Sequence, residues 1–367
     1  MPTPAPMPVI GNEYLYAVAP SSGNQSTFAV YQIDQNSGLL TQLSTATIPV
    51  RAAQNIAVDA TGQNFYVTGF EAPGTNMDLV KVDPNTHNIT PMPGQTFHTL
   101  PAYLGDGDCC PNTVAVDTTG KFAYVGGLND GSIHVYSVDQ SSGTWTEISP
   151  SNYQPSSGGT SVYAVAIDPN NKFLYESQRD SSFVNIWIRD PNSGMITPQA
   201  SSPFQTGALT TDVSVSADGK YLFVPQYEVS HVMAYSISSG GSPLPLPSSP
   251  LDAGNAPGRA VIDPQDRFVF VLNTGAYNGG PPSVQAFKFD TATRQITAVP
   301  NSTFTVYAAG QLVIDATGKF LYALGNQQTM GWSIDQTTGA LSPLSGSPFK
   351  ITGTAGLVVQ QSAGGTL

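Results

Sequence analysis

Short runs of alternating apolar and polar residues, separated by turn signals, follow one another along the chain. The stretch 311–350 contains two pairs of such runs, at 312–314 with 320–324 and at 330–334 with 340–344, and each pair encloses a turn rich in Asp and Gly. Alternation with a period of two is typical of half-buried strands, and a short Asp-Gly turn between two strands is typical of a hairpin. This stretch is therefore predicted to form a sheet of four antiparallel strands.

The same unit recurs through the sequence. A turn residue that follows the first run of each unit recurs 47 to 58 positions apart, as Asp59, Asp117, Asp168, Ser216, Asp263 and Asp315. A period near 50 residues with four short strands per repeat is the spacing of β-propeller blades. Six complete copies and one divided copy predict an all-β fold, a seven-bladed β-propeller with four antiparallel strands in each blade.

The divided copy lies at the two ends of the chain. The first three runs, at 14–18, 28–33 and 39–43, have no leading run before them, and the missing run appears at 356–360. Pairing of the C-terminal run with the N-terminal three would remove the free edges of the ring. We therefore expect the two terminal segments to share one closing blade.

This periodic pattern fixes the expected domain organisation. Residues 1–13 are rich in Pro and are expected to be a tether, residues 14–361 a single propeller domain, and residues 362–367 a tail. The beginning of the chain has neither the basic nor the apolar segment of a signal peptide. A surface rich in hydroxyl and amide groups is typical of exported bacterial proteins, so we expect a periplasmic or secreted protein whose signal segment is absent from this sequence.

Charge excludes some partners. Only 10% of the residues are charged, and the formal net charge is −12. Nucleic acid binding requires clustered Lys and Arg, which are absent from this sequence. No apolar run approaches the ~18 residues required to cross a bilayer. We expect neither nucleic acid nor a membrane span, and the sequence assigns no oligomeric state.

The few charged residues fall into two groups. Five Lys and Arg and six Asp recur beside the turns and are expected to be structural. Several of the others, including three of the eight remaining basic residues, lie in loops that enter the first strand or join the second and third strands of a blade, and these loops share one face, at the mouth of the central channel. Expected ligand-binding residues on this face are Arg259, Arg179, Arg51, Asp212, Tyr227 and Tyr277, and expected catalytic residues are Glu228, His231 and Glu176.

An insertion at 93–111 precedes the third unit and contains the two cysteines. Cys109 and Cys110 are adjacent, so a disulfide between them would be strained because neighbouring Cα atoms are ~3.8 Å apart. Free thiols, a vicinal disulfide and a metal or redox role all stay open. Four scattered His residues do not form a metal site, and no cofactor is expected, although calcium binding at oxygen-rich loops stays open.

The repeated hairpin V-x-x-D-P/T-x-G-K-F-L-Y-V, followed by S-x-V-x-x-Y-x-I-D-x-x-T-G-x-L, resembles the seven-bladed lactonase-type propellers, which include 6-phosphogluconolactonases and carboxymuconate-lactonising enzymes. The resemblance implies an Arg-His pair at one inner strand and an Asn-Glu pair at the end of the next strand. In this sequence Thr211 and Asp212 stand at the first place and Gln226 and Tyr227 at the second, while Glu228 is one position late. The family's catalytic motif is therefore not intact.

The residues and the resemblance together favour a lactone hydrolase or isomerase that acts on, or binds, a small carboxylate or lactone at the channel mouth. In that case Glu228 or Glu176 would serve as general base with His231 as partner, and Arg259 and Arg179 would hold a carboxylate or a developing oxyanion. The alternative is a non-enzymatic binding or surface scaffold that contacts proteins or glycans through the same face.

Overall fold

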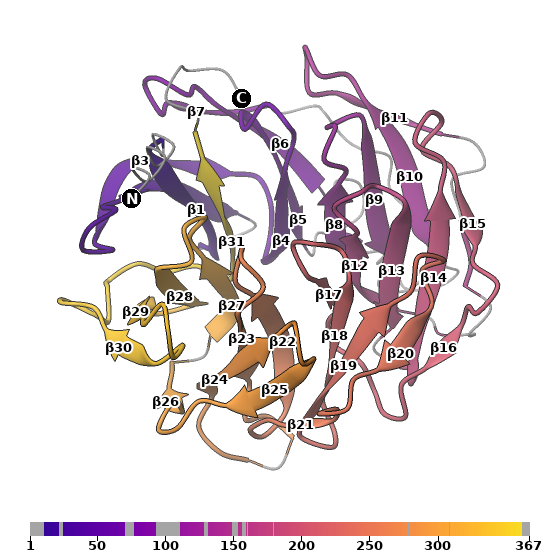
Figure 1. Ribbon diagram of the computed structural model, residues 1–367. Coiled ribbons are helices and arrows are strands. Elements are labelled where there is room, and N and C mark those ends of the chain that lie inside the picture. Colours follow the sequence, from indigo (N-terminus) through magenta and orange to yellow (C-terminus); the bar gives the residue numbers. More distant parts are fainter. Residues whose placement is uncertain are drawn as a thin grey trace, which may run out of the picture.

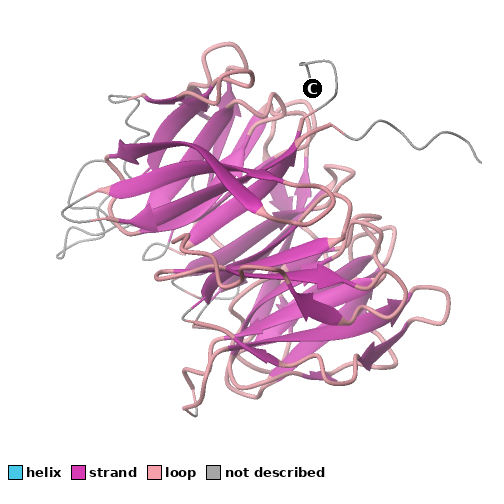
Figure 2. Cartoon of the chain, turned by 90° about the vertical axis from the view of Figure 1, so that its left-hand side faces the viewer, coloured by secondary structure: helices cyan, strands magenta, loops and turns pink. Residues whose placement is uncertain are grey.

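The computed structural model describes residues 11–21, 25–69, 77–92, 111–127, 131–148, 153–155, 159, 161–178, 180–277, 279–307 and 309–361. Within these residues the chain forms seven separate antiparallel sheets. The sheets stand around a central axis as the blades of a propeller (Figure 1). The predicted seven-bladed β-propeller is confirmed. A side view of the described part shows only strands and loops (Figure 2).

Each blade is named here by its position in the ring and is given from its inner strand outward. Blade 1 contains β31 (Ala355–Gln360), β1 (Glu13–Pro20), β2 (Ser26–Ile33) and β3 (Leu40–Ile48). Blade 2 contains β4 (Ala53–Val58), β5 (Asn64–Gly69), β6 (Met77–Val82) and β7 (Ile89–Pro91). Blade 3 contains β8 (Pro111–Val116), β9 (Phe122–Gly127), β10 (Ile133–Val138) and β11 (Trp145–Glu147).

The remaining blades follow the same order. Blade 4 contains β12 (Val162–Ile167), β13 (Phe173–Gln178), β14 (Phe183–Arg189) and β15 (Ile196–Pro198). Blade 5 contains β17 (Ser214–Val215), β18 (Tyr221–Gln226), β19 (His231–Ile237) and β20 (Pro243–Pro245). Blade 6 contains β22 (Pro257–Ile262), β23 (Phe268–Asn273), β24 (Ser283–Asp290) and β25 (Gln295–Ala298). Blade 7 contains β27 (Ala309–Ile314), β28 (Phe320–Gly325), β29 (Met330–Ile334) and β30 (Leu341–Pro343).

Blade 1 closes the ring with the two ends of the chain, as the sequence predicts. β31 pairs antiparallel with β1, so that Glu13 lies opposite Gln360 and Val18 lies opposite Ala355. Figure 1 shows this C-terminal strand in yellow beside the indigo strands of the N-terminal segment. The inner strands of neighbouring blades contact one another in the order β4, β8, β12, β17, β22, β27, β31 and back to β4. The ring is therefore held at its centre by backbone as well as by side chains.

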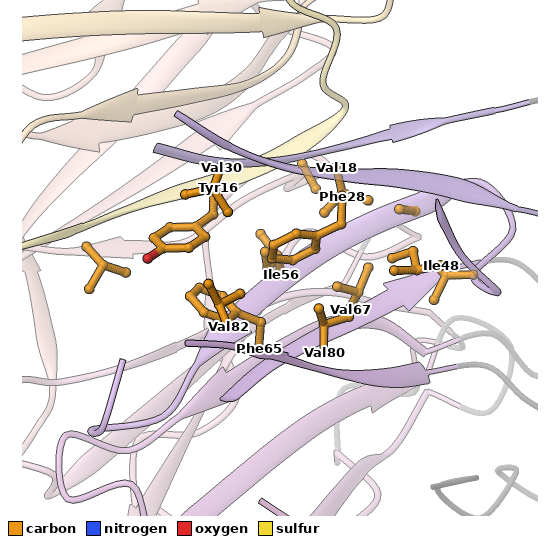
Figure 3. Packing of buried hydrophobic residues seen from close by; sticks show 14 of the residues in the cluster. Tyr16, Val18, Phe28, Val30, Ile48, Ile56, Phe65, Val67, Val80 and Val82 are labelled. Atoms are coloured by element: carbon orange, nitrogen blue, oxygen red, sulfur yellow. The ribbon is translucent and has the colours of Figure 1, made fainter. Parts of the chain in front are cut away.

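The apolar core lies between the blades. In the cluster between blades 1 and 2, the ring of Tyr16 lies 4.2 Å from that of Phe65, and Phe28 meets Phe65 edge to face at 5.5 Å. Figure 3 shows these rings interleaved with Val30, Val67 and their neighbours. The second strand of blades 2 to 7 buries both faces against adjacent blades, since its burial pattern is continuous, whereas outer strands such as β3 are largely exposed. Each pair of neighbouring blades shares one such cluster, which makes the blades mutually dependent.

A repeated tyrosine also ties four of the blades to the next one. The hydroxyl of Tyr322 donates to the carbonyl of Gly38 at 2.7 Å. Gly38 has a φ of 69°, a left-handed conformation that Gly adopts without strain, and it ends the second turn of blade 1. Three other tyrosines make the same bond to the next blade, from Tyr66 to Gly143, Tyr124 to Gly194 and Tyr175 to Gly241. These contacts satisfy buried hydroxyls that would otherwise be costly.

Turn residues fall into a buried set and an exposed set. Asp315 is buried, and its Oδ1 accepts the backbone N–H of Phe320 at 2.6 Å, which closes the first turn of blade 7. Asp335, in the second turn, is exposed and accepts the amides of Thr337 and Thr338 at 3.0 and 2.8 Å. The expectation that the recurrent Asp residues shape turns is thus supported by their hydrogen bonds.

Three short strands were not anticipated from the sequence. The three are β16 (Phe204–Gln205), β21 (Leu251–Asp252) and β26 (Phe304–Thr305). Each follows the fourth strand in the sequence and pairs with the part of the third strand that the fourth strand leaves unpaired. They extend the sheets of blades 4, 5 and 6 to five strands. In the part of the chain that the structure describes, no helix has the length and apolar character needed to span a membrane.

Candidate functional site

The face that carries the loops into the inner strands and the loops between second and third strands is called the mouth face here. Its described part in blades 5 and 6 comprises residues 206–213, 227–230, 253–256 and 274–277. These segments lie at one end of β17, β18, β22 and β23, because each blade begins and ends its inner hairpin there. Most of the predicted site residues that the structure describes belong to this region.

An ion pair links blades 5 and 6 on the mouth face. Arg259 lies on β22 and places Nη1 3.8 Å from Oδ1 of Asp212, which precedes β17. The Arg259 side chain is 25% exposed and that of Asp212 is 10% exposed. The Nε of Arg259 also donates to the carbonyl of Gly310 in blade 7 at 3.2 Å. A single guanidinium therefore spans three blades while part of it stays open to solvent.

The Asp212 carboxylate is held from several sides. Its Oδ2 accepts the backbone N–H of Ala260 at 3.2 Å and the hydroxyl of Ser214 at 3.5 Å. Burial raises the pKa of the Asp212 carboxyl, and the charge of Arg259 and the amide of Ala260 oppose this rise without cancelling it. The carboxylate is thus held in place, and burial makes its ionisation costly. The positive charge of Arg259 offsets part of that cost.

The position of Asp212 belongs to a repeated feature. The inner strands of five blades carry a register shift near their first residue, as between Pro257 and Arg259 in blade 6. At the residue after the shift, the side chain of Thr113 accepts the amide of Val165 at 3.3 Å. The Gln311 side chain similarly accepts the amide of Gly356 at 3.0 Å. Asp212 makes the equivalent bond to blade 6 and, unlike Thr113 and Gln311, carries a charge at this place.

Two aromatic side chains from loops of the same two blades also lie on the mouth face. Tyr227 and Tyr277, from the loops after β18 and β23, meet edge to face with their ring centroids 5.8 Å apart. Tyr277 is 49% exposed and Tyr227 is half-buried. Exposed aromatic rings are suited to contact with the apolar face of a small ring compound. The structure therefore brings both predicted tyrosines together.

Glu228 and His231 occupy the same loop and the start of β19. Glu228 is half-buried in the turn. The Nε2 of His231 lies 3.5 Å from Oδ1 of Asp252, whose side chain is 97% exposed. The acid partner that the structure gives His231 is therefore Asp252, which the sequence reasoning missed because β21 was not anticipated. The catalytic roles of Glu228 and His231 stay predictions.

Glu176 lies inside blade 4, on β13. It is fully buried, and its carboxylate accepts hydrogen bonds from Nε2 of Gln178 at 2.8 Å and from Nε1 of Trp187 at 2.9 Å. These bonds bind the carboxylate within its own blade. Glu176 therefore lies among buried partners instead of on the exposed part of the mouth face.

The other predicted residues are less informative. Arg51 is exposed in the loop that leads into β4 and interacts with a neighbouring group. Arg179, Cys109 and Cys110 lie outside the described residues, as does almost all of the insertion at 93–111. In the described ranges, no three His, Cys, Asp or Glu side chains form a group that could hold a metal ion.

A buried Ser-His-Glu series in blade 3 was not found from the sequence. The Oγ of Ser132 lies 2.9 Å from Nε2 of His134, whose Nδ1 lies 3.3 Å from Oε1 of Glu147. The order of atoms resembles a nucleophile, a base and its orienting acid. Ser132 is fully buried and His134 is 2% exposed, so we interpret this series as a structural link between β10 and β11.

The opposite face carries a polar cavity of about 290 Å³ between the turns of blades 2 and 3. Lys81 and Asp83 are its charged lining residues, and the rest of the lining is mainly hydroxyl and amide groups. It contains no acid-base pair of the kind found around Arg259. The mouth face of blades 5 and 6 is therefore the better candidate site.

Comparison with known proteins agrees with the fold and with the predicted resemblance. The sequence profile of the family described as "Lactonase, 7-bladed beta-propeller" matches residues 75–210. The chain is also 22% identical over 305 residues to the 6-phosphogluconolactonase of Bacillus subtilis (strain 168), covering 81% of this chain and 82% of that protein. This chain is similar to the lactonase-type propellers. The resemblance that the repeated hairpins indicate is confirmed.

Solved structures support the propeller fold of this chain. A candidate 6-phosphogluconolactonase from Bacteroides fragilis NCTC 9343 superposes with a TM-score of 0.81 at 17% identity, covering 97% of this chain and all of that one. The periplasmic gluconolactonase of Pseudomonas aeruginosa superposes with a TM-score of 0.74 at 16% identity, covering 93% and 97% of the two chains. At these identities the likeness concerns the fold, and the reaction has to be argued from the site.

Proposed function

We propose that this lactonase-type propeller hydrolyses a small lactone at the mouth face of blades 5 and 6. The observation that carries the proposal is the pair formed by Arg259 and Asp212, a partly exposed guanidinium fixed by a buried carboxylate on the face that also carries Tyr227 and Tyr277. The names of its relatives point to sugar-derived lactones. Loops on a rigid scaffold are a common place for such sites.

Arg259 would act on the charge that the reaction creates. Attack of water on a lactone carbonyl places negative charge on the carbonyl oxygen, and a fixed guanidinium stabilises that charge more than it stabilises the neutral lactone. The same group would then bind the carboxylate of the ring-opened product. Because Asp212 is held by Ala260 and Ser214, Arg259 is oriented before the substrate arrives.

Glu228 would serve as the general base. It would take a proton from water while the water oxygen bonds to the carbonyl carbon, and the ring C–O bond would break as the leaving alkoxide is protonated. Asp212 is a less suitable base, because its oxygens already accept hydrogen bonds and face Arg259. His231, paired with Asp252, would tune the charge of this loop.

Tyr277 and Tyr227 would position the ring of the substrate. A tyrosine that exposes about half of its surface can stack on the C–H groups of a sugar ring and direct its hydroxyl to a ring oxygen. The two rings come from adjacent blades, so they form one wall of the proposed site.

The composition of the chain leads us to place this reaction outside the cytoplasm. The surface is poor in charge and rich in hydroxyl and amide groups, which is typical of exported proteins. A related propeller is named as a periplasmic gluconolactonase. Fractionation of cells that express the native gene would test this location.

The experiment is a pH-stat assay of the purified protein against glucono-δ-lactone, 6-phosphogluconolactone and an unrelated γ-lactone, with spontaneous hydrolysis subtracted. We expect catalysis with at least one sugar lactone and a loss of about 100-fold or more in kcat for Glu228→Gln. Asp218→Asn is the matched control, because it removes an exposed carboxylate of the same blade on the opposite face and should keep most of the activity. Hydrolysis of every lactone at the spontaneous rate would contradict the proposal.

A further inference from the structure

The boundary between blades 7 and 1, called the seam here, has an acidic residue at a place where most other blades have a basic one. Glu13 is the first residue of β1 and lies three positions before Tyr16, one of the aromatic residues repeated in all blades. In the other blades, the residue three positions before that aromatic is basic, with one Gln. These residues are Gln63, Lys121, Lys172, Lys220, Arg267 and Lys319.

Glu13 also differs from its equivalents in burial. It is 1% exposed, and its Oε1 has no hydrogen-bond partner. Lys121 and Lys319, by contrast, are exposed. A buried carboxylate oxygen without a partner is expensive unless the group binds a proton.

A similar contact is made at two other blade boundaries by the residue one position earlier, which is Asn171 in blade 4 and Asp266 in blade 6. Oδ1 of Asn171 accepts the amide of Thr118 in the preceding blade at 3.1 Å, and Oδ1 of Asp266 accepts the amide of Ala217 at 2.8 Å. Thr118 and Ala217 each follow the buried turn residue of their blade. Glu13 accepts the amide of Ala316, which follows Asp315 in the same way. Glu13 thus makes a recurrent inter-blade contact at the seam.

In doing so, Glu13 brings a second carboxyl group beside Asp315. Asp315 is 1% exposed, and its Oδ1 and Oδ2 accept the amides of Phe320 and Thr317 at 2.6 and 3.2 Å. Both oxygens of Asp315 thus already accept N–H groups, whereas Oε1 of Glu13 has no partner, so we place the shared proton on Glu13. Burial raises the pKa of Glu13 to about 7, and the charge of Asp315 and a hydrogen bond with its carboxylate contribute next.

The other groups around Glu13 do not neutralise the pair. Lys319 is exposed and lowers the pKa of Glu13 only as the smallest influence. The charges of Asp315, Glu13 and Asp34 together raise the pKa of Tyr322 further above its usual value, after burial. Gln360 on β31 and Ile33 on β2, which lie opposite Glu13, carry no charge.

We propose that Glu13 and Asp315 form a proton-sharing carboxyl pair that fastens the seam between blades 7 and 1, so that the ring closes more tightly at mildly acidic than at mildly alkaline pH. Protonated Glu13 donates to Asp315, whereas loss of that proton leaves two buried negative charges side by side. No other blade boundary in the described residues combines a Glu at this place with an anchor Asp.

The sign of the effect follows from proton binding. The folded state holds the proton of Glu13 up to about pH 7, whereas the unfolded chain releases it near 4.5. The stabilisation is therefore fully present below about pH 4.5 and is lost as the pH rises to about 7. Lactone hydrolysis is not involved, so the inference stands apart from the proposed function.

The test compares the wild-type protein with Glu13→Gln, whose amide donates to Asp315 at every pH. Chemical unfolding of both proteins between pH 5 and pH 8 should show the wild-type unfolding constant rising by about 10- to 100-fold relative to the variant. The matched control is Lys121→Gln, at the equivalent place in blade 3, for which the ratio should not change with pH. A ratio for Glu13→Gln that is also independent of pH would overturn the proposal.

A second measurement locates the effect and does not depend on the variant folding. Hydrogen exchange of the wild-type protein, corrected for the intrinsic rate at each pH, should show that protection of β1 and β31 falls between pH 5 and pH 8. Protection of β9 and β10 in blade 3 should change less. Equal loss of protection in all blades would contradict a carboxyl pair that stabilises the seam.

Discussion

Arg259 Nη1 lies 3.8 Å from Asp212 Oδ1, across the boundary between blades 5 and 6. The two residues are 47 positions apart, which is close to one repeat of the sequence. Equivalent places in other blades hold Thr113 and Gln311, which contact the next blade through neutral groups. Blades 5 and 6 have thus turned a structural contact into a charged one.

Removal of the Asp212 charge should strengthen the binding of anions. Asp212→Asn keeps a side-chain oxygen for the amide of Ala260 but leaves Arg259 without a counter-charge. We expect gluconate, the product of sugar lactone hydrolysis, to bind about 5-fold more tightly, because a partly exposed ion pair is worth about 1 kcal/mol. Titration calorimetry measures this. Asp290→Asn, in an exposed turn of the opposite face, is the control and should leave the affinity unchanged.

Loss of the exposed aromatic ring should weaken substrate binding without affecting the fold. Tyr277→Ala should raise KM by about 5- to 10-fold, since an aromatic contact of this kind contributes about 1 kcal/mol, while the thermal midpoint changes by no more than a few degrees. Tyr277 is 49% exposed, so little buried surface is lost. Leu244→Ala, at an exposed site on β20, is the matched control. An unchanged KM in Tyr277→Ala would remove this residue from the proposed site.

Deletion of β31 should unfold far more than one strand. The truncation after residue 354 removes the inner strand of blade 1 and exposes the edge of β1. We expect loss of the cooperative thermal transition, because the cluster that contains Tyr16 and Phe65 loses Ala355 and Val359. Truncation after residue 361 leaves β31 complete and should unfold like the full chain. A cooperative transition at the usual temperature in the shorter protein would show that ring closure is dispensable.

Acid should loosen the exposed turns. Hydrogen bonds from Ser141 and Ser142 lower the pKa of Asp139 to about 2, so this carboxylate contributes stability above its unfolded pKa near 3.8, and the contribution is lost as the pH falls toward 2. Asp139→Asn imitates the protonated state. The wild type should therefore be more stable than the variant at pH 6, and the difference should shrink between pH 4 and pH 2. Urea unfolding measures it, and a constant difference would contradict this account of the turn.

Much of this structure could be predicted from the sequence because its information is local and repeated. The turn signals at Asp315 and Gly318 and the alternation on either side define a hairpin without reference to the rest of the chain. The closing blade could be predicted because the N-terminal unit lacks its first strand-like run and the C-terminal end has one run without a partner. Even the tyrosine places could be recognised by their period, although the bond from Tyr322 to Gly38 could not.

The functional site was less predictable, since it depends on which blades become neighbours. Assigning each residue to its loop predicted one face for Arg259, Asp212, Tyr227 and Tyr277. The structure pairs Arg259 with Asp212 and Tyr227 with Tyr277. The sequence offered no signal that Asp252 would reach His231, because the two-residue strand β21 is too short to show a pattern. Glu176 looked like a loop carboxylate, yet Gln178 and Trp187 bind it inside the blade.

The most direct test of the account is the steady-state hydrolysis of glucono-δ-lactone by Arg259→Ala beside the wild type. Arg294→Ala, at an exposed turn on the opposite face of the same blade, is the control. If Arg259 stabilises the developing oxyanion, kcat/KM should fall by about 100-fold in folded Arg259→Ala and by less than 2-fold in Arg294→Ala. Arg259→Ala should also lower the thermal midpoint, because it leaves the Asp212 carboxylate without its counter-charge. Wild-type kcat/KM in a folded Arg259→Ala protein would contradict a catalytic site at the mouth face of blades 5 and 6.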